Sequence, residues 1–373
     1  MQGIKGRDLE DIFIRSLEGI FDAVHIPEIK EQAEEFVRKV SCLVFDSEVR
    51  RAQTRENGLR RYPSALLSAY LDALPHALAR ENTDEITKAR ELVAVIVQDL
   101  VSMSDQKNVT IHDIIPTLHQ IASRFNAMCL EDSWVRKSGG CSGIRIMTRT
   151  PDLGIKWIND REVELVRTLL HILKDLPFDL PRDIDDVFDV LTGVLRVSNA
   201  YLDSQAEGGL NARTKLGHLI GIFFAELSSA NPIVRQAAQT CIELLVTLSG
   251  KSAVELLLPH RERMLAAIYT KPLRALPFSI QIGMIEAVRY CVSLDPPLAE
   301  LNDELLRLLH ETLALADADD MNLLGRVNPR QGAIEVTKLR VACIKLLTAS
   351  MPMTDFFSKQ HQTRQRSSHH LFY

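Results

Sequence analysis

The sequence contains a kind of helix that needs a neighbour on one face, and this feature limits the possible folds most. Asn231 and Pro232 suit the start of a helix, because an asparagine side chain accepts a free amide hydrogen bond and proline lacks the amide that would stay unpaired. The apolar residues that follow are spaced by four or three positions: Val234, Ala238, Cys241, Leu245 and Leu248. This spacing predicts a helix over 231–249 with one buried stripe.

The same pattern recurs in three other segments, which begin at Val37, Ala89 and Leu339 and continue with apolar residues at helical spacing. Each such helix would bury one face against its neighbours, so the series predicts stacked helical pairs with about 40–47 residues per repeat. A stack of repeats also suits a chain of 373 residues without a break in composition, because no single core must grow with length. We therefore expect an all-α, HEAT/armadillo-like helical-repeat solenoid.

The helical period is interrupted once in the interior and is lost at the end. We expect HEAT-like helical repeats over 1–130 and 161–352. Residues that favour turns crowd the intervening stretch, and they are Gly139, Gly140, Gly143, Pro151 and Gly154. They predict a long irregular connection over 131–160, in which Ile144–Met147 alternates briefly but would lack a partner strand. Residues 353–373 are polar and basic, which predicts a disordered tail.

Composition restricts the environment of the chain. Hydrophobic residues at 46% and charged residues at 25% are typical of a folded protein. The net charge of −5 gives no general attraction to nucleic acid or to an anionic membrane. No stretch reaches the ~20 apolar residues of a membrane span. None of the 6 cysteines forms a Cys-x-x-Cys pair, so reduced thiols in the cytoplasm or nucleus are expected.

One segment has the spacing of a nucleophile elbow, with Cys141 between Gly139 and Gly143. A hydrolase would also need a strand before the turn, a helix after it, and a base such as His119 or His171 near the thiol. The preceding residues are charged, and Pro151 soon follows. We therefore interpret the segment as a flexible glycine loop and predict no catalytic residues.

The candidates for a metal site are equally weak. His112, His119, Cys129 and Cys141 do not have the spacing of a zinc motif. The aspartates at 317, 319 and 320 lack the turn glycine and the further ligands of a calcium loop. There is no phosphate-binding glycine loop. The sequence thus predicts neither a metal nor a cofactor.

One basic cluster is a candidate for partner binding. Its members are Arg50, Arg51, Arg55, Arg60 and Arg61. Guanidinium groups bind carboxylates and phosphates in bidentate geometry. The alternative is a solvated basic turn, neutralised by Glu48 and by acidic neighbours. No aromatic series accompanies the arginines, which argues against base stacking on single-stranded nucleic acid.

Several segments carry a resemblance to a known family. The most distinctive is Lys271 to Gly283, KPLRALPFSIQIG, in which prolines and glycine interrupt helix in a fixed order. It is similar to the transformation/transcription domain-associated protein family in its fungal form. The similarity continues through 301–309, 315–320 and 339–345, and it is weaker at 154–158. It extends over most of 1–352.

This resemblance implies a function without catalysis. Members of the family are giant phosphatidylinositol-3-kinase-related pseudokinases built chiefly of HEAT-like helices. They are scaffolds of histone acetyltransferase coactivator complexes, including SAGA, and they bind transcription activation domains. By resemblance, the expected partners are subunits of such complexes and acidic activation domains, in the nucleus. No direct sequence-specific contact with nucleic acid and no membrane binding are expected.

The sequence lacks the kinase-like region of this family and ends in Ser367–Tyr373 where another repeat should follow. We therefore expect a non-enzymatic fragment of a longer solenoid. Two alternatives remain at this stage. One is a helical-repeat scaffold for nuclear transport or for a phosphatase, against which the Lys271 to Gly283 segment argues. The other is the Cys141 hydrolase.

Overall fold

The structure is a computed structural model in which the chain divides into two compact units, Met1–Ala200 and Tyr201–Tyr373. It describes residues 6–53, 64–106, 110–150, 153, 155–177, 180–200, 210–319, 323 and 329–353. Within these residues there are helices and turns but no strand, and none of the helices is long and apolar enough to cross a membrane. The expected all-α helical-repeat class is confirmed.

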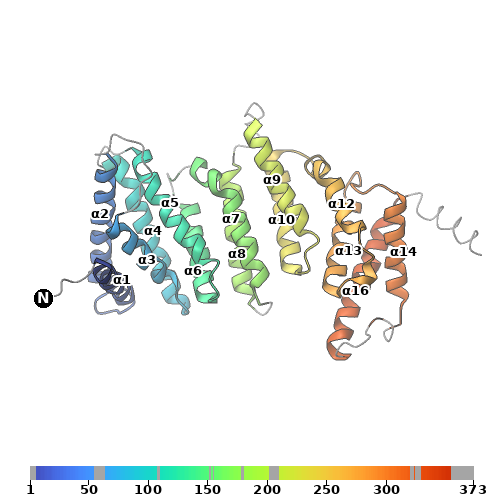
Figure 1. Cartoon of the computed structure of the whole chain (residues 1–373), viewed down its shortest axis with the longest axis horizontal. Helices are drawn as coiled ribbons and strands as arrows, with labels where there is room; N and C mark the ends of the chain where they lie inside the picture. Colours follow the sequence, from blue (N-terminus) through green and yellow to red (C-terminus); the bar gives the residue numbers. More distant parts are fainter. Residues whose placement is uncertain are drawn as a thin grey trace, which may run out of the picture. The chain divides into compact units, whose positions relative to one another are not determined.

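The first unit is a succession of helices that pack on one another in pairs (Figure 1). They are α1 (Gly6–Ala23), α2 (Lys30–Gln53), α3 (Ala65–Leu78), α4 (Thr83–Gln106), α5 (Ile111–Met128), α6 (Trp134–Arg149), α7 (Ile155–Asp175) and α8 (Pro181–Ser198). The closest packing joins α1 to α3, α5 to α6, and α7 to α8. The core consists of side chains such as Phe21, Tyr70 and Phe125, which are fully buried between these helices.

The second unit contains long helices together with the short helical segments α11, η1 and η2. They are α9 (Leu210–Glu226), α10 (Pro232–Ser249), α11 (Ala253–Leu257), η1 (Leu258–His260), α12 (Arg261–Tyr269), η2 (Leu273–Ala275), α13 (Phe278–Val292), α14 (Asp303–Asp317) and α16 (Pro329–Ser350). The helices α13 and α14 both pack against α16, and α9 packs against α10.

The helix expected over 231–249 is confirmed as α10. The Asn231 side chain accepts a hydrogen bond of 2.9 Å from the Ile233 amide, and Pro232 occupies the first turn. Gly250 ends the helix with a φ of 64°, a left-handed conformation that favours glycine. The expected stripe is buried from Val234 to Leu245, together with its neighbours Ala237 and Ile242.

The prediction of an irregular connection over 131–160 is wrong, because most of this stretch is the helix α6. A Cβ atom added at Gly139 would lie 2.8 Å from the Leu78 carbonyl oxygen. At Gly140 it would lie 2.6 Å from the Phe125 carbonyl oxygen, and at Gly143 it would lie 2.3 Å from the Phe125 ring. The glycines therefore let α6 approach α3 and α5 closely. This packing outweighs a helix-propensity cost of about 1 kcal/mol for each glycine. Ile144–Met147 is likewise helical rather than extended.

Two other expectations lie partly or wholly outside the described residues. The predicted tail at 353–373 lies outside them beyond Met353. The segment between α2 and α3, which holds three of the clustered arginines, is also outside them.

Candidate interaction site

The candidate basic cluster begins at the last turn of α2. Arg50 Nη2 lies 2.7 Å from Asp46 Oδ2, and Arg51 Nη1 lies 3.4 Å from Glu48 Oε1. The Arg50 side chain is nevertheless 76% exposed, so its guanidinium is accessible to a partner. The other members, Arg55, Arg60 and Arg61, lie outside the described residues. The cluster as a whole therefore stays a prediction.

Cys141 lies in a place unsuited to nucleophilic catalysis. It is buried within α6, and burial raises the pKa of its thiol to about 12. A reactive cysteine needs a partly exposed thiolate with a lowered pKa. The candidate bases have other partners, since Arg161 Nε donates to Nδ1 of His119 at 2.9 Å and His171 Nε2 lies 3.5 Å from Asp175 Oδ2. The geometry argues against the hydrolase alternative.

The metal candidates are not assembled into a site within the described part of the chain. Among these residues, no three or more His, Cys, Asp or Glu side chains lie together in a group that could hold a metal ion. Cys129 is buried, and burial raises the pKa of its thiol well above the usual value. The His112 side chain and Asp320 lie outside what the structure describes.

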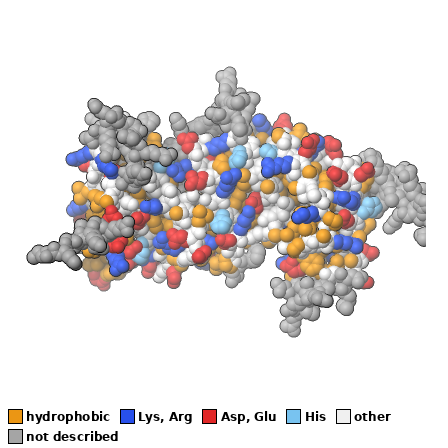
Figure 2. Space-filling view, in the orientation of Figure 1, with side chains coloured by type: hydrophobic (Ala, Val, Ile, Leu, Met, Phe, Trp, Pro, Cys, Tyr) orange, Lys and Arg blue, Asp and Glu red, His pale blue; other side chains and the backbone are white. Residues whose placement is uncertain are grey.

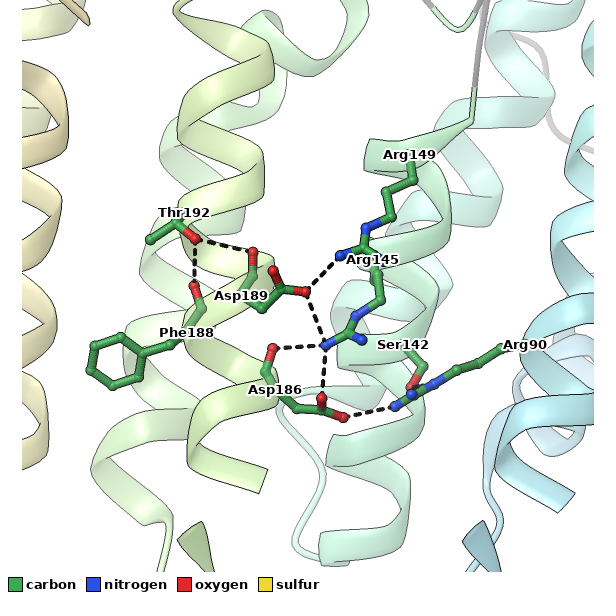
Figure 3. A network of polar contacts seen from close by, with 8 residues as sticks. All are labelled: Arg90, Ser142, Arg145, Arg149, Asp186, Phe188, Asp189 and Thr192. Carbon is green, nitrogen blue, oxygen red and sulfur yellow. Dashed lines mark hydrogen bonds and ion pairs between the residues drawn. The ribbon is translucent and has the colours of Figure 1, made fainter. Parts of the chain in front are cut away.

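A polar network joins three helices of the first unit (Figure 3). Asp186 of α8 receives hydrogen bonds of 3.0 Å from Arg90 of α4 and from Arg145 of α6. Asp189, one turn further along α8, lies 2.7 Å from Arg149 Nη2 and 3.5 Å from Arg145 Nη2. The network thus links helices that are distant in sequence. Its role is to hold the repeats in position, not to carry out a reaction.

The network is only partly accessible to solvent. The Arg145 side chain is 16% exposed, and Asp186 is 43% exposed. Burial by itself would raise the pKa of the Asp186 carboxyl, but the hydrogen bond from Arg90 and the charges of Arg145 and Arg90 lower it below its ordinary value. The carboxylate is therefore preferentially ionised in the folded chain.

We expect Asp186→Asn to destabilise the first unit by about 1–2 kcal/mol at neutral pH, because it leaves Arg145 and Arg90 with a weaker partner. This magnitude allows for solvent screening of a half-exposed carboxylate. Thermal unfolding followed by circular dichroism measures the change. Asp185→Asn is the matched control, since Asp185 is the exposed neighbour on the same turn of α8.

The stability difference between the parent and Asp186→Asn should also depend on pH. The pKa of Asp186 is lower in the folded than in the unfolded chain, so its ion pairs stabilise the fold above an unfolded pKa of about 3.9. That stabilisation is lost as the pH falls through the lowered folded value. The difference between parent and variant should therefore shrink below about pH 4. A difference that is constant from pH 7 to pH 3 would contradict the role of the ionised carboxylate.

A surface groove lies between α2 and α4, with a volume of about 790 Å³. Most of its charged side chains already have partners within the chain. Arg38 binds Asp99 through two hydrogen bonds of 3.0 and 3.1 Å, and Lys39 Nζ lies 2.6 Å from Glu35 Oε1. This groove therefore offers little uncompensated charge to a partner.

The distinctive segment from Lys271 to Gly283 forms the turn η2 and the start of α13. The Leu273 amide donates a hydrogen bond of 2.8 Å to Glu311 of α14, which fixes the turn against that helix. A Cβ at Gly283 would lie 2.4 Å from the Ser228 carbonyl oxygen, so this glycine permits the contact with the turn that precedes α10. The segment is therefore a packing element at the junction of several helices.

Sequence reasoning missed the Arg90–Asp186–Arg145 network. Its members are 96 and 41 positions apart along the chain, and no local motif links them. The available signal is the acidic start of the α8 segment, Asp183 to Asp186, which by itself indicates only a favourable N-terminal end for a helix dipole.

Comparison with known proteins identifies one family. The family described as the Tra1 HEAT repeat ring region matches residues 4–372. The SAGA complex/NuA4 acetyltransferase complex subunit TRA1 of Saccharomyces cerevisiae is 29% identical over 368 residues, which cover 94% of this chain and 10% of that protein. The corresponding Tra1 subunit of Schizosaccharomyces pombe is 34% identical over 258 residues, covering 68% of this chain and 7% of that protein.

A more distant similarity reaches animals. The human transformation/transcription domain-associated protein is 25% identical over 309 residues, covering 79% of this chain and 8% of that protein. The chain thus spans a tenth or less of the length of these curated relatives. The resemblance noted from Lys271 to Gly283 and the segments after it is confirmed.

Proposed function

Because this chain belongs to the Tra1 HEAT repeat ring family, we propose that it is a non-catalytic scaffold segment of a transcription coactivator complex. The observation that carries the proposal is the family match, which extends over residues 4–372. The expected partners are subunits of histone acetyltransferase complexes of the SAGA and NuA4 kind, and the expected location is the nucleus. A scaffold of stacked helices distributes its binding energy over many surface residues. The buried thiol of Cys141 agrees with a non-catalytic role.

A chimera tests this function. The matching segment of the S. cerevisiae subunit is replaced by this chain, and the chimera is tagged and purified. We expect it to co-purify with subunits of both acetyltransferase complexes. The control is a chimera that carries a helical-repeat segment of similar length from an unrelated scaffold. A chimera that is produced at normal levels but co-purifies with neither complex would contradict the proposal.

We further propose that the basic cluster at the end of α2 binds acidic activation segments. Support comes from the accessible guanidinium of Arg50 and from the density of arginines between Arg50 and Arg61. Amphipathic acidic segments bring carboxylates that guanidinium groups bind well, together with apolar residues for the grooves of a helical array.

Reversing three charges of the cluster, in Arg51→Glu, Arg55→Glu and Arg60→Glu, should weaken the binding of an acidic activation peptide by about tenfold or more at low salt. A tenfold change corresponds to ~1.4 kcal/mol, a modest sum for three reversed surface charges. The effect should diminish as salt screens the charges. Fluorescence anisotropy with a labelled peptide measures both.

The charge-matched control reverses three exposed basic residues outside the cluster, in Arg196→Glu, Lys251→Glu and Arg263→Glu. This control changes net charge equally but leaves the cluster intact. If both triple variants lose the same affinity, the effect is one of net charge, and the cluster has no specific role.

A further inference from the structure

A histidine of α5, His119, takes part in a polar contact with α7. Nε of Arg161 on α7 donates a hydrogen bond of 2.9 Å to Nδ1 of His119, and Nη2 of the same guanidinium donates one of 3.4 Å to the His119 carbonyl oxygen. The two residues are 42 positions apart, and their helices belong to different pairs, α5–α6 and α7–α8. The contact is therefore part of the joint between two helical pairs of the first unit.

A second contact completes this joint. Asn126 of α5 donates a hydrogen bond of 2.8 Å to Glu164 Oε1 of α7, and Arg161 Nη1 donates one of 3.3 Å to Glu164 Oε2. The Arg161 side chain is only 17% exposed, so its guanidinium is held among protein groups. Among the described residues, the charged groups that act on the His119 ring are Arg161, Asp160 and Glu164, all on α7. The other helices packed against α5, which are α2, α3, α4 and α6, contribute none of them.

The contact between Arg161 and His119 requires a neutral imidazole. A neutral ring has one nitrogen that accepts a hydrogen bond, whereas both nitrogens of a protonated ring donate. A guanidinium only donates, so protonation of His119 removes the acceptor and brings two cations together. We propose that His119 makes the joint between α5 and α7 sensitive to pH, because the neutral ring binds Arg161 and the protonated ring releases it.

The pKa of His119 agrees with this direction. Burial and the charge of Arg161 lower this pKa below its ordinary value of 6.5, against the opposing charges of Asp160 and Glu164. The folded pKa therefore lies below the unfolded one. The stabilisation is complete above about pH 6.5, and it is lost as the pH falls from there through the folded value. A modest acidification thus loosens α7 from α5, without the help of a partner.

The test must isolate one ring. Histidine side chains reach the surface at several places among charges of both signs (Figure 2), and the chain has 11 histidines. An NMR titration of the histidine Cε1–H signals of the purified chain resolves them, and the signal of His119 is assigned by its loss in His119→Gln. We expect the His119 signal to titrate with a midpoint below about pH 6.5. A midpoint at or above this value would overturn the proposal.

The role of Arg161 is tested in the same titration. Arg161→Met removes both the donor and the positive charge, so the midpoint of His119 should rise. Arg167→Met is the matched control, because Arg167 is exposed on the same helix, and it should leave the midpoint unchanged. A midpoint that Arg161→Met does not raise would overturn the proposal.

Hydrogen exchange followed by mass spectrometry locates the loosening. Between about pH 7.5 and about pH 5.5, the protection factors of the α7 amides around Arg161 should fall at least about threefold, as expected for the loss of one hydrogen bond. In His119→Gln an amide oxygen that does not titrate can accept from Arg161, so the protection of α7 should no longer change. His310→Gln, at an exposed site of α14, is the matched control and should behave like the parent. An equal loss of protection in the parent and in His119→Gln would assign the effect to other groups and overturn the proposal.

Discussion

Gly140→Ala is expected to destabilise the first unit by about 3 kcal/mol, although alanine is the better helix former by ~1 kcal/mol. The added methyl group would lie 2.6 Å from the Phe125 carbonyl oxygen and 2.6 Å from the Cys129 Sγ. The carbonyl belongs to the backbone of α5 and cannot rotate away. Relief therefore requires α6 to move from α5, which opens the core around Phe125.

Thermal unfolding measures this effect, and a loss of this size lowers the melting temperature by of order 10 °C in a unit of this length. Gly193→Ala is the matched control, because Gly193 is a helical glycine of α8 whose Cβ would meet nothing closer than 3.9 Å. The control should be neutral or slightly stabilising. If the two variants melt together, the close approach of α5 and α6 is not the reason for the glycine.

The fold class and the individual amphipathic helices could be predicted from the sequence. For α10 the N-cap Asn231, the first-turn Pro232 and the apolar spacing all indicate the same helix, and the structure contains it. Such agreement between local signals is what allows a sequence to be interpreted without its three-dimensional context. The segment from Lys271 to Gly283 also led to the correct family.

The glycine-rich helix α6 could not be predicted, because local and tertiary effects oppose each other there. Gly139, Gly140 and Gly143 weaken the helix locally, and their benefit arises only from contacts with Leu78 and Phe125. Those contacts depend on how three helices pack, which spacing along the chain does not reveal. An interpretation based on propensity therefore favoured a loop.

The buried environment of Gln281 in α13 was unpredictable for a related reason. The notable property of Gln281 is its unpartnered acceptor, and burial creates that property. In the sequence it is one polar residue within an otherwise apolar segment. The basic cluster is the opposite case, since it is evident in the sequence, whereas three of its five arginines lie outside the described residues.

The helix α16 carries an exposed apolar stripe with a consequence for association. Ile334 is 59% exposed, Val341 46% and Ile344 57%. Their spacing by seven and three positions places them on one face of the helix, opposite the buried Leu339, Cys343 and Leu346. Thr337 and Lys338, which are exposed, lie between Ile334 and Val341 on this face, whereas Val341 and Ile344 are neighbours. Exposed apolar residues grouped on one face favour contact with another surface, whereas scattered single residues are ordinary.

We expect the purified chain to self-associate through this stripe at high concentration. Burying these exposed side chains of two copies against each other removes their apolar area from water and favours association. Lost translational and rotational freedom opposes it, so the association is weak and depends on concentration. Static light scattering over a concentration series should show a rising mean mass.

The triple variant Ile334→Lys, Val341→Lys and Ile344→Lys should remain monomeric at every concentration, because charged ammonium groups would have to lose water in the contact. The control places the same number of lysines at scattered exposed sites, in Ile12→Lys, Leu130→Lys and Leu258→Lys, where the parent residues are 55%, 55% and 50% exposed. It has the same net charge and should associate like the parent. Equal loss of association in both variants would assign the effect to charge repulsion, and a parent chain that stays monomeric would show that the stripe alone is too weak to hold two copies together.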